Sequence, residues 1–175
     1  IFYWTKGHFV TDFKLKIGRG LQWMGSEEGL ERDIAVTKAV REGFPQARIL
    51  VDANDGFTVE ETIRYVEQVA ECRIYWIEEP FRENREHLRE LKACLARSSP
   101  ETLIADGESR PNPEFLLELA AERLVDVLIM DVAGFGFSAW RGIMPRVARA
   151  GARASPHCWG DPIKVHYTAQ LAAGL

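Results

Sequence analysis

One pattern recurs along the 175-residue chain: a short apolar or β-branched run, a charged residue at its end, then a loop and an amphipathic helix. This is the βα unit from which parallel sheets are built. The six runs cover residues 12–18, 47–54, 73–79, 102–108, 125–132 and 152–157. Because the runs are apolar on both faces and are joined by helices, they predict a parallel sheet covered by helices.

Local signals place the helices between these runs. Helices are expected over about 27–42, 58–69, 83–96, 113–121, 138–150 and from 161 onward. Thr58 with Glu61 three residues later forms a capping box, and Asn112 before Pro113 is a typical helix start. Asp161 before Pro162 is expected to open the last helix. Pro145 leaves the extent of the fifth helix open, because proline disrupts a helix interior.

Composition excludes several classes of function. The chain is 46% hydrophobic and 27% charged, as expected for one globular core. A net charge of −4 and a pI near 5.6 argue against nucleic acid or an anionic membrane as partner. The three cysteines lack metal-binding or CxxC spacing, and neither a long apolar run nor a signal peptide is present. A cytoplasmic location is therefore expected.

Two architectures use such units: the open doubly wound sheet and the (β/α)₈ barrel. The open sheet usually carries a glycine-rich nucleotide loop, and the sequence has neither G-x-G-x-x-G nor a P-loop. Instead, charged or ionisable residues end successive runs: Lys14 and Lys16, Asp52, Glu78, Glu108, Asp131 and His157. In a barrel these ends converge on one site at the carboxyl face of the strands. The expected fold class is thus α/β, of the (β/α)₈ type.

Three of these residues suggest a metal site. Asp52, Glu78 and Glu108 offer only carboxylate oxygens, which suits a hard divalent cation such as Mg²⁺. Lys14 and Lys16 stand two residues apart on a strand, so they point to one face. Two ammonium groups beside a metal are expected to lower each other's pKa, which would allow a lysine to act as a general base.

The two last runs suggest a second base. His157 is the candidate for this base, and Asp131 at the end of the preceding run is expected to fix its tautomer and raise its basicity. The predicted site would then hold one base on each face of a metal-bound substrate.

Simpler interpretations stay open for individual residues. Asp52 could cap the turn formed by residues 54–56, and Asp106 rather than Glu108 could be the ligand because both have the same strand parity. Lys-x-Lys alone is typical of a solvated strand face, and a lone histidine is usually structural. The metal-site interpretation rests on all six runs ending this way together.

In their order and spacing these motifs resemble the enolase superfamily, and within it the mandelate racemase-like subgroup. The matching segments are "FKLKIG", "VDAN", "WIEEP", "ADGES", "IMDVAGFG" and "SPHCWG". The resemblance covers about residues 12–175 and implies one partial barrel domain over residues 1–175, holding strands two to seven. A capping domain and strand eight, with its electrophilic glutamate, are expected to be missing. Residues 1–11 fit no expected element.

The resemblance also implies a function: Mg²⁺-assisted abstraction of the proton α to a carboxylate, giving an enolate. It assigns Asp52, Glu78 and Glu108 to the metal, Lys16 to one base, and His157 with Asp131 to the opposite base or acid. Lys14 would neutralise a substrate carboxylate oxygen. An acid-sugar dehydratase is expected first, and a racemase or epimerase of a 2-hydroxy acid is the alternative. A truncated metal-binding or interaction remnant without turnover is the alternative of another class. The full-length protein is expected to form a homo-oligomer.

Overall fold

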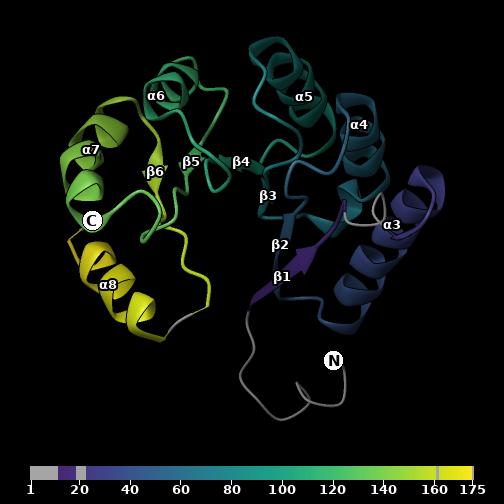
Figure 1. The fold of residues 1–175 in the computed structure, drawn as a ribbon. Helices are drawn as coiled ribbons and strands as arrows, with labels where there is room; N and C mark the ends of the chain where they lie inside the picture. Colours follow the sequence, from purple (N-terminus) through teal and green to yellow (C-terminus); the bar gives the residue numbers. More distant parts are fainter. Residues whose placement is uncertain (1–11, 19–22, 161, 175) are drawn as a thin grey trace. The chain divides into compact units, whose positions relative to one another are not determined.

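The computed structural model describes residues 12–18, 23–160 and 162–174, in which six strands alternate with helices (Figure 1). Residues 1–11, for which the sequence suggests no element, and Asp161, expected to open the last helix, lie outside the described residues. The chain divides into two compact units, Ile1–Thr102 and Leu103–Leu175. The expectation of a single partial domain over the whole chain stays a prediction.

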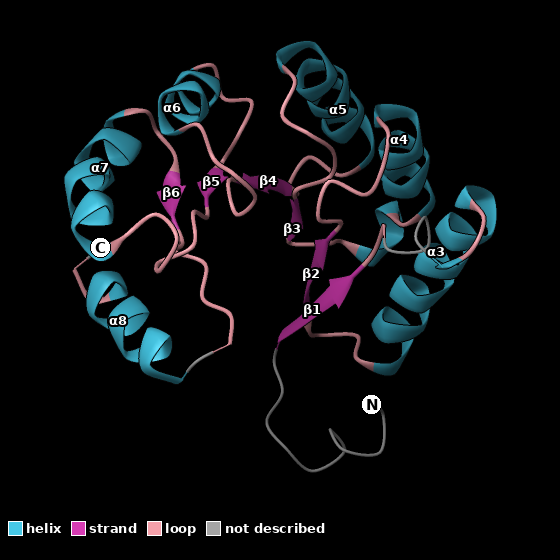
Figure 2. Cartoon of the chain, in the orientation of Figure 1, coloured by secondary structure: helices cyan, strands magenta, loops and turns pink. Residues whose placement is uncertain are grey.

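The first unit holds three parallel strands in chain order: β1 (Asp12–Lys16), β2 (Arg48–Asp52) and β3 (Trp76–Glu78). The helices α3 (Ser26–Gly43), α4 (Val59–Gln68) and α5 (Arg85–Ser98) accompany them, and a short 3₁₀ turn, η1 (Ala70–Cys72), precedes β3 (Figure 2). Ile49, Val51 and Ile77 of the central strands are completely buried. Burial of such side chains is the main force that holds helices on a sheet.

A buried polar contact links the end of β1 to α3. The backbone N–H of Gly18 donates a hydrogen bond of 2.7 Å to Asp33 Oδ2 in the middle of that helix. Gly18 has φ +71°, and a Cβ atom there would lie 2.8 Å from the Ala53 carbonyl oxygen, so only glycine fits. The hydroxyls of Thr37 and Tyr65 lie 2.7 Å apart and join α3 to α4. The chain leaving β1 is therefore fixed at its carboxyl end.

The second unit repeats the pattern with β4 (Leu103–Asp106), β5 (Val127–Leu128) and β6 (Arg153–Ala154), which are also parallel. Its helices are α6 (Pro113–Ala121), α7 (Phe137–Arg149) and α8 (Pro162–Ala172). Strands β5 and β6 are shorter than the apolar runs predicted. Pairing resumes beyond them as an isolated parallel bridge between Asp131 and His157. Regular pairing therefore covers only part of each predicted run.

Helix α7 is anchored by one buried aromatic side chain. Trp140 is fully buried, and its Nε1 donates a hydrogen bond of 3.0 Å to the carbonyl of Met130. Its ring packs edge to face against Phe135, with centroids 5.8 Å apart. Pro145 lies inside α7, and the helix continues past it to Arg149. Anchoring by Trp140 accounts for a helix at a place where proline left the prediction open.

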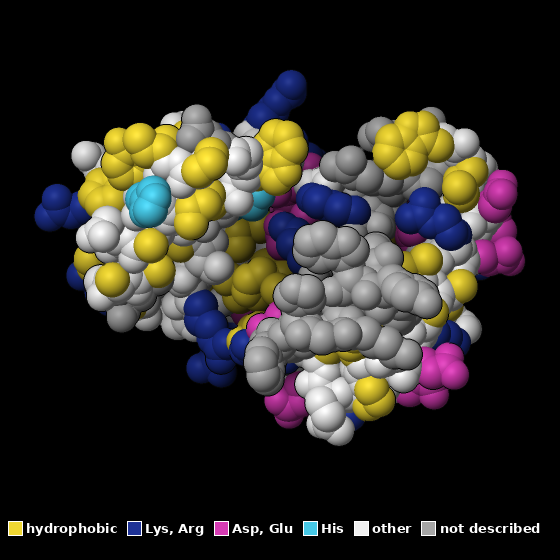
Figure 3. All heavy atoms as spheres, turned by 90° about the horizontal axis from the view of Figure 1, so that it is seen from below, with side chains coloured by type: hydrophobic (Ala, Val, Ile, Leu, Met, Phe, Trp, Pro, Cys, Tyr) yellow, Lys and Arg dark blue, Asp and Glu magenta, His cyan; other side chains and the backbone are white. Residues whose placement is uncertain are grey.

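The second unit also exposes apolar side chains, which gather on the face shown in Figure 3. The large exposed ones at and before α8 are Trp159, Ile163, Val165 and Tyr167.

Within the described residues, no helix has the length and apolar character needed to cross a lipid bilayer.

Two of the predicted helix starts are confirmed by their caps. Thr58 Oγ1 accepts from the backbone N–H of Glu61, while the Glu61 carboxylate accepts from the N–H of Thr58, which completes the capping box of α4. Asn112 caps α6 with Pro113 in its first turn. Helix α5 begins at Arg85 with Asn84 as its cap, slightly later than expected.

We predict that Thr58→Ala lowers the free energy of unfolding by about 1 kcal/mol, because it leaves an N–H at the start of α4 without its side-chain acceptor. Thr58→Ser keeps the hydroxyl and is the matched control, expected to change stability little. Urea unfolding followed by circular dichroism measures both. An equal loss in the two variants would show that the methyl group, rather than the cap, stabilises α4.

Candidate active site

Strand register brings three of the predicted residues into one row. Lys16 of β1 is opposite Asp52 of β2, and Asp52 is in turn opposite Glu78 of β3. All three close their strands, so the row lies at the carboxyl edge of the sheet. The side chains of Asp52 and Glu78 are 0% and 2% exposed, whereas Lys14 and Lys16 retain about a third or more of their side-chain exposure.

Both lysines reach these carboxylates. Lys14 Nζ lies 2.5 Å from Glu78 Oε1 and 2.9 Å from Asp52 Oδ2. Lys16 Nζ contacts the same Asp52 oxygen and donates a hydrogen bond of 2.8 Å to Asn54 Oδ1. The prediction that Lys14 and Lys16 point to one face is therefore confirmed. Asn54 is a contact that the sequence analysis missed, although its place two residues after Asp52 was the available signal.

The pKa values of Asp52 and Glu78 explain why two lysine side chains lie beside them. Burial raises the pKa of Glu78 to about 7, and the negative charge of Asp52 adds to the effect, while Lys14 opposes it. Burial alone would also raise the pKa of Asp52, but hydrogen bonds and charge from Lys16 and Lys14 hold it below its usual range. The two carboxylates therefore need positive charge close by to be ionised together.

Lys14 has a raised pKa in these surroundings, and the lowered value expected beside a divalent cation stays a prediction. Burial lowers the pKa, but the carboxylates of Glu78 and Asp52 outweigh burial, so the pKa is raised above its usual value. The expectation considered two ammonium groups beside a divalent cation. Between carboxylates alone, attraction to negative charge dominates.

Asp52 also has the capping role that the sequence left open. Its Oδ1 accepts a hydrogen bond of 3.0 Å from the backbone N–H of Asn54, while Oδ2 faces the lysines. Asn54 and Asp55 have φ of +47° and +57°, so the turn after β2 is strained. Capping the turn and facing the lysines are compatible, because each uses a different carboxylate oxygen.

In the second unit, His157 is oriented by Asp131. His157 Nδ1 lies 3.2 Å from Asp131 Oδ2, and the backbones of the two residues form the bridge between neighbouring chain segments. Asp131 Oδ1 accepts from the N–H groups of Ala133 and Gly134 at 2.9 and 2.8 Å. Burial alone would raise the pKa of Asp131, but these N–H groups and His157 keep it low. An ionised acceptor places the imidazole proton on Nδ1 and leaves Nε2 as the basic atom.

Glu108 lies on the other side of the imidazole. Its Oε2 is 3.3 Å from His157 Nε2, yet this buried oxygen makes no hydrogen bond among the described residues. The chain turns sharply at Gly107, whose φ is +113° and where a Cβ would lie 2.9 Å from Leu116 Cδ1. β4 ends at Asp106, so the strand-parity argument that made Asp106 and Glu108 equivalent was wrong. The contact of Glu108 with His157 was not predicted.

A cavity of about 480 Å³ opens beside these residues in the second unit. Glu108, Asp131, Arg110 and Phe135 line it. Arg110 has φ +49° and was not singled out in the sequence, where it stands in an ordinary loop between strand and helix. The cavity provides room for a small molecule next to the Asp131–His157 pair.

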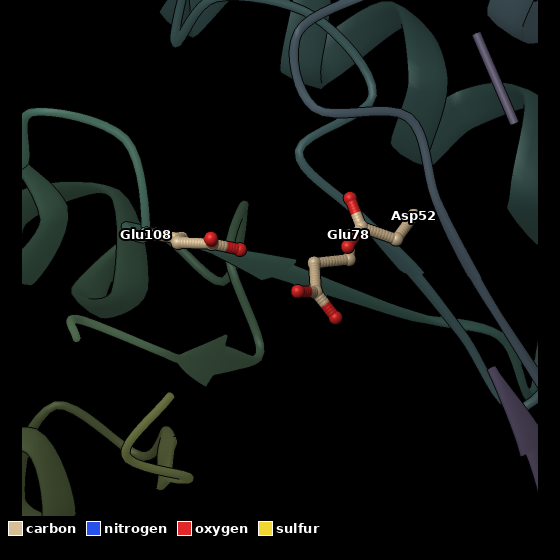
Figure 4. A group of neighbouring side chains, drawn as sticks. All are labelled: Asp52, Glu78 and Glu108. Carbon is tan, nitrogen blue, oxygen red and sulfur yellow. The ribbon is translucent and has the colours of Figure 1, made fainter. Parts of the chain in front are cut away.

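The residues fit a divalent cation as donors. Figure 4 labels Asp52 and Glu78, which belong to the first unit, and Glu108, which belongs to the second. Each offers carboxylate oxygens, without sulfur or nitrogen, which is the donor set that Mg²⁺ prefers. The buried Glu108 oxygen without a hydrogen bond and the raised pKa of Glu78 both indicate carboxylates that a cation would stabilise.

Comparison with known proteins identifies the family. The model of the family described as "Enolase C-terminal domain-like" matches residues 3–175, nearly the whole chain. The chain belongs to this family. The predicted resemblance to the enolase superfamily and its mandelate racemase-like members is thereby confirmed, as is the α/β fold class of the family's barrel domain.

Three members of the enolase superfamily illustrate the likeness. D-galactarolactone cycloisomerase from Agrobacterium fabrum is 31% identical over 150 residues, which cover 84% of this chain and 38% of that protein. Galacturonate dehydratase from Geobacillus sp., solved with D-galacturonate and 5-keto-4-deoxy-D-galacturonate, has a TM-score of 0.90 and 32% identity. A mandelate racemase/muconate lactonizing protein from Geobacillus sp. Y412MC10, solved with magnesium and tartrate, has a TM-score of 0.91 and 31% identity.

The chain spans less than half of these enolase-superfamily proteins. Both structural matches cover 99% of this chain, but only 47% of the dehydratase and 45% of the magnesium–tartrate protein. The activities of the longer proteins therefore bear on this chain as a basis for proposals.

We predict that Asp131→Asn changes the tautomer of His157. Asparagine keeps an oxygen for the Ala133 and Gly134 N–H groups but presents an NH₂ donor to His157, so the proton should move from Nδ1 to Nε2. Long-range ¹⁵N–¹H NMR of the neutral imidazole measures this directly. A variant that keeps the Nδ1–H tautomer would show that Asp131 does not orient the ring.

Proposed function

We propose that this chain is the catalytic barrel region of a Mg²⁺-dependent enzyme that removes the proton α to the carboxylate of a sugar acid and then eliminates water. One observation carries the proposal: each candidate base lies next to a carboxylate that could bind the metal. Lys14 and Lys16 accompany Asp52 and Glu78, while an Asp131-oriented His157 accompanies Glu108. Membership of the enolase C-terminal family supports it.

In the proposed site, Asp52, Glu78 and Glu108 hold the cation. A bound Mg²⁺ would draw electron density from the substrate carboxylate and so acidify the adjacent C–H. Lys14 neutralises a carboxylate oxygen, and Lys16, as the unprotonated amine, takes the α-proton on one face and becomes an ammonium. Lys16 Nζ donates a hydrogen bond of 2.8 Å to Asn54 Oδ1, which limits the positions from which the amine can act.

His157 acts on the opposite face. Its Nε2 is the basic ring nitrogen when Nδ1–H points to Asp131, and this atom lies 3.3 Å from the proposed metal ligand Glu108. For dehydration, protonated His157 gives its proton to the β-hydroxyl, which leaves as water while the enolate electrons form the new double bond. The enol product then becomes a 2-keto acid. The likeness to a galacturonate dehydratase favours this outcome.

A second outcome uses the same groups. If His157 returns a proton to the α-carbon, the product is the epimer, and the likeness to a mandelate racemase/muconate lactonizing protein supports this candidate. Retention of the hydroxyl with deuterium at the α-carbon distinguishes it from dehydration. The homo-oligomeric state and the cytoplasmic location stay predictions from the sequence.

We predict that Glu78→Gln weakens Mg²⁺ binding at least about tenfold, because it removes the charge of a metal ligand from a buried site. Isothermal titration with Mg²⁺, or Mn²⁺ as a spectroscopic probe, measures the affinity. Glu90→Gln on α5 removes the same charge away from the site and is the control. Equal affinity in the two variants would exclude Glu78 as a ligand.

We predict that the chain with Mg²⁺ incorporates deuterium α to the carboxylate of a sugar acid in D₂O, with D-galacturonate and tartrate among the acids tested. Lys16→Ala or His157→Asn should reduce exchange from its own face of the substrate at least about 100-fold, the size of a general-base contribution. NMR of the recovered acid and a keto-acid assay give the readout.

The exchange experiment also separates the two classes of function. Metal binding without exchange for any acid would support the alternative of a metal-binding remnant. Exchange that persists in a Lys16→Ala/His157→Asn double variant would contradict the two-base mechanism, even if the chain is an enzyme.

A further inference from the structure

A second cavity lies in the first unit at the opposite end of the strands. It has a volume of about 490 Å³ and is lined by the loops that lead into β2 and β3 and by the end of α5. Its lining includes two arginines, Arg41 and Arg73, and the rings of Tyr75, Pro45 and Pro100. Since Asp52 and Glu78 close β2 and β3 at their carboxyl ends, this cavity is separate from the candidate active site.

Arg41 is held rigidly at this cavity. Its Nε donates a hydrogen bond of 2.8 Å to the carbonyl of Cys72. Its Nη1 donates to the carbonyls of Phe44, Pro45 and Ala47 at 3.2, 2.8 and 2.8 Å. Every acceptor is a backbone carbonyl, and within the described ranges the remaining nitrogen, Nη2, makes no hydrogen bond. A fixed guanidinium with two unused N–H donors is prepared to bind an anion.

Arg73 adds a second positive charge. It is exposed and adopts φ +47°, and its guanidinium has neither a hydrogen bond nor an ion pair with any described residue, while its backbone N–H donates to the Ala70 carbonyl. Burial lowers the pKa of Arg41, and the charge of Arg73 lowers it further, so the two guanidinium groups repel each other. No carboxylate is among the groups that shift Arg41. An anion between the two would relieve this repulsion.

The other charges at the cavity leave an excess of one positive charge. Arg48 also lines it, but its guanidinium is paired with Asp12 through contacts of 2.6 and 3.0 Å. Glu101 supplies one negative charge against Arg41 and Arg73. The Tyr75 ring and the two prolines make part of the wall apolar. The Arg48 guanidinium lies over the Tyr75 ring, 5.5 Å from its centroid.

We propose that this cavity binds a small organic anion. Its carboxylate or phosphate group is held between Arg41 Nη2 and Arg73, and its body packs against Tyr75, Pro45 and Pro100. This site does not depend on the proposed catalytic function. It uses different residues, needs no metal, and can be tested without any turnover.

The test is an NMR titration of the full chain with phenyl phosphate. The Arg41 Nε–H, hydrogen-bonded to Cys72, gives an assignable signal next to the proposed anion. We expect saturable shifts of this signal and of the Tyr75 ring. Inorganic phosphate should bind more weakly, because it lacks the apolar body, and phenol should not bind. Equal affinity for the two phosphates, or the absence of saturable shifts, would overturn the proposal.

Variants locate the site. Arg73→Gln should weaken phenyl phosphate binding about tenfold, the effect of losing one hydrogen bond to a charged group. Arg73→Lys should retain more of the affinity. Arg89→Gln on α5 removes an exposed arginine elsewhere in the same unit and should leave binding unchanged. Binding unaffected by Arg73→Gln, in a variant with an unchanged melting temperature, would also overturn the proposal.

Discussion

The burial of two neighbouring carboxylates is the constraint on which the candidate site depends. Asp52 and Glu78 are opposite each other on adjacent parallel strands, almost without solvent exposure. Water cannot stabilise both charges there, so the surrounding chain must provide cations. Lys14 and Lys16 meet this need from the neighbouring strand, and their side chains are aligned by the same register. The ionic cluster and the strand pairing therefore stabilise each other.

The order of the elements and most helix starts could be predicted, because both depend on local chemistry. The capping box at Thr58 and the Asn112–Pro113 start are formed by residues adjacent in sequence, so their pattern is sufficient. The convergence of Lys14 and Lys16 followed from strand alternation. These predictions needed no knowledge of contacts between distant segments.

Predictions that depended on distant contacts or on backbone turns were less accurate. Strand parity did not extend through Gly107, whose positive φ redirects the chain before Glu108. The raised pKa of Lys14 reflects distances to two carboxylates that a sequence does not give. The contact of Glu108 with His157, and the arginines at the two cavities, likewise depend on how loops return to the sheet. The assignment of catalytic and metal-binding roles stays a prediction.

Asp131 uses both of its oxygens at once: one holds the N–H groups of Ala133 and Gly134, and the other holds His157. The conformation of the loop that leads into α7 and the protonation of the imidazole are consequently coupled, because both depend on the Asp131 carboxylate. A fluctuation that opens this loop would also release the histidine ring. A substitution at position 131 must therefore satisfy two requirements with one side chain: it must accept the hydrogen bonds of the loop and orient the imidazole of His157.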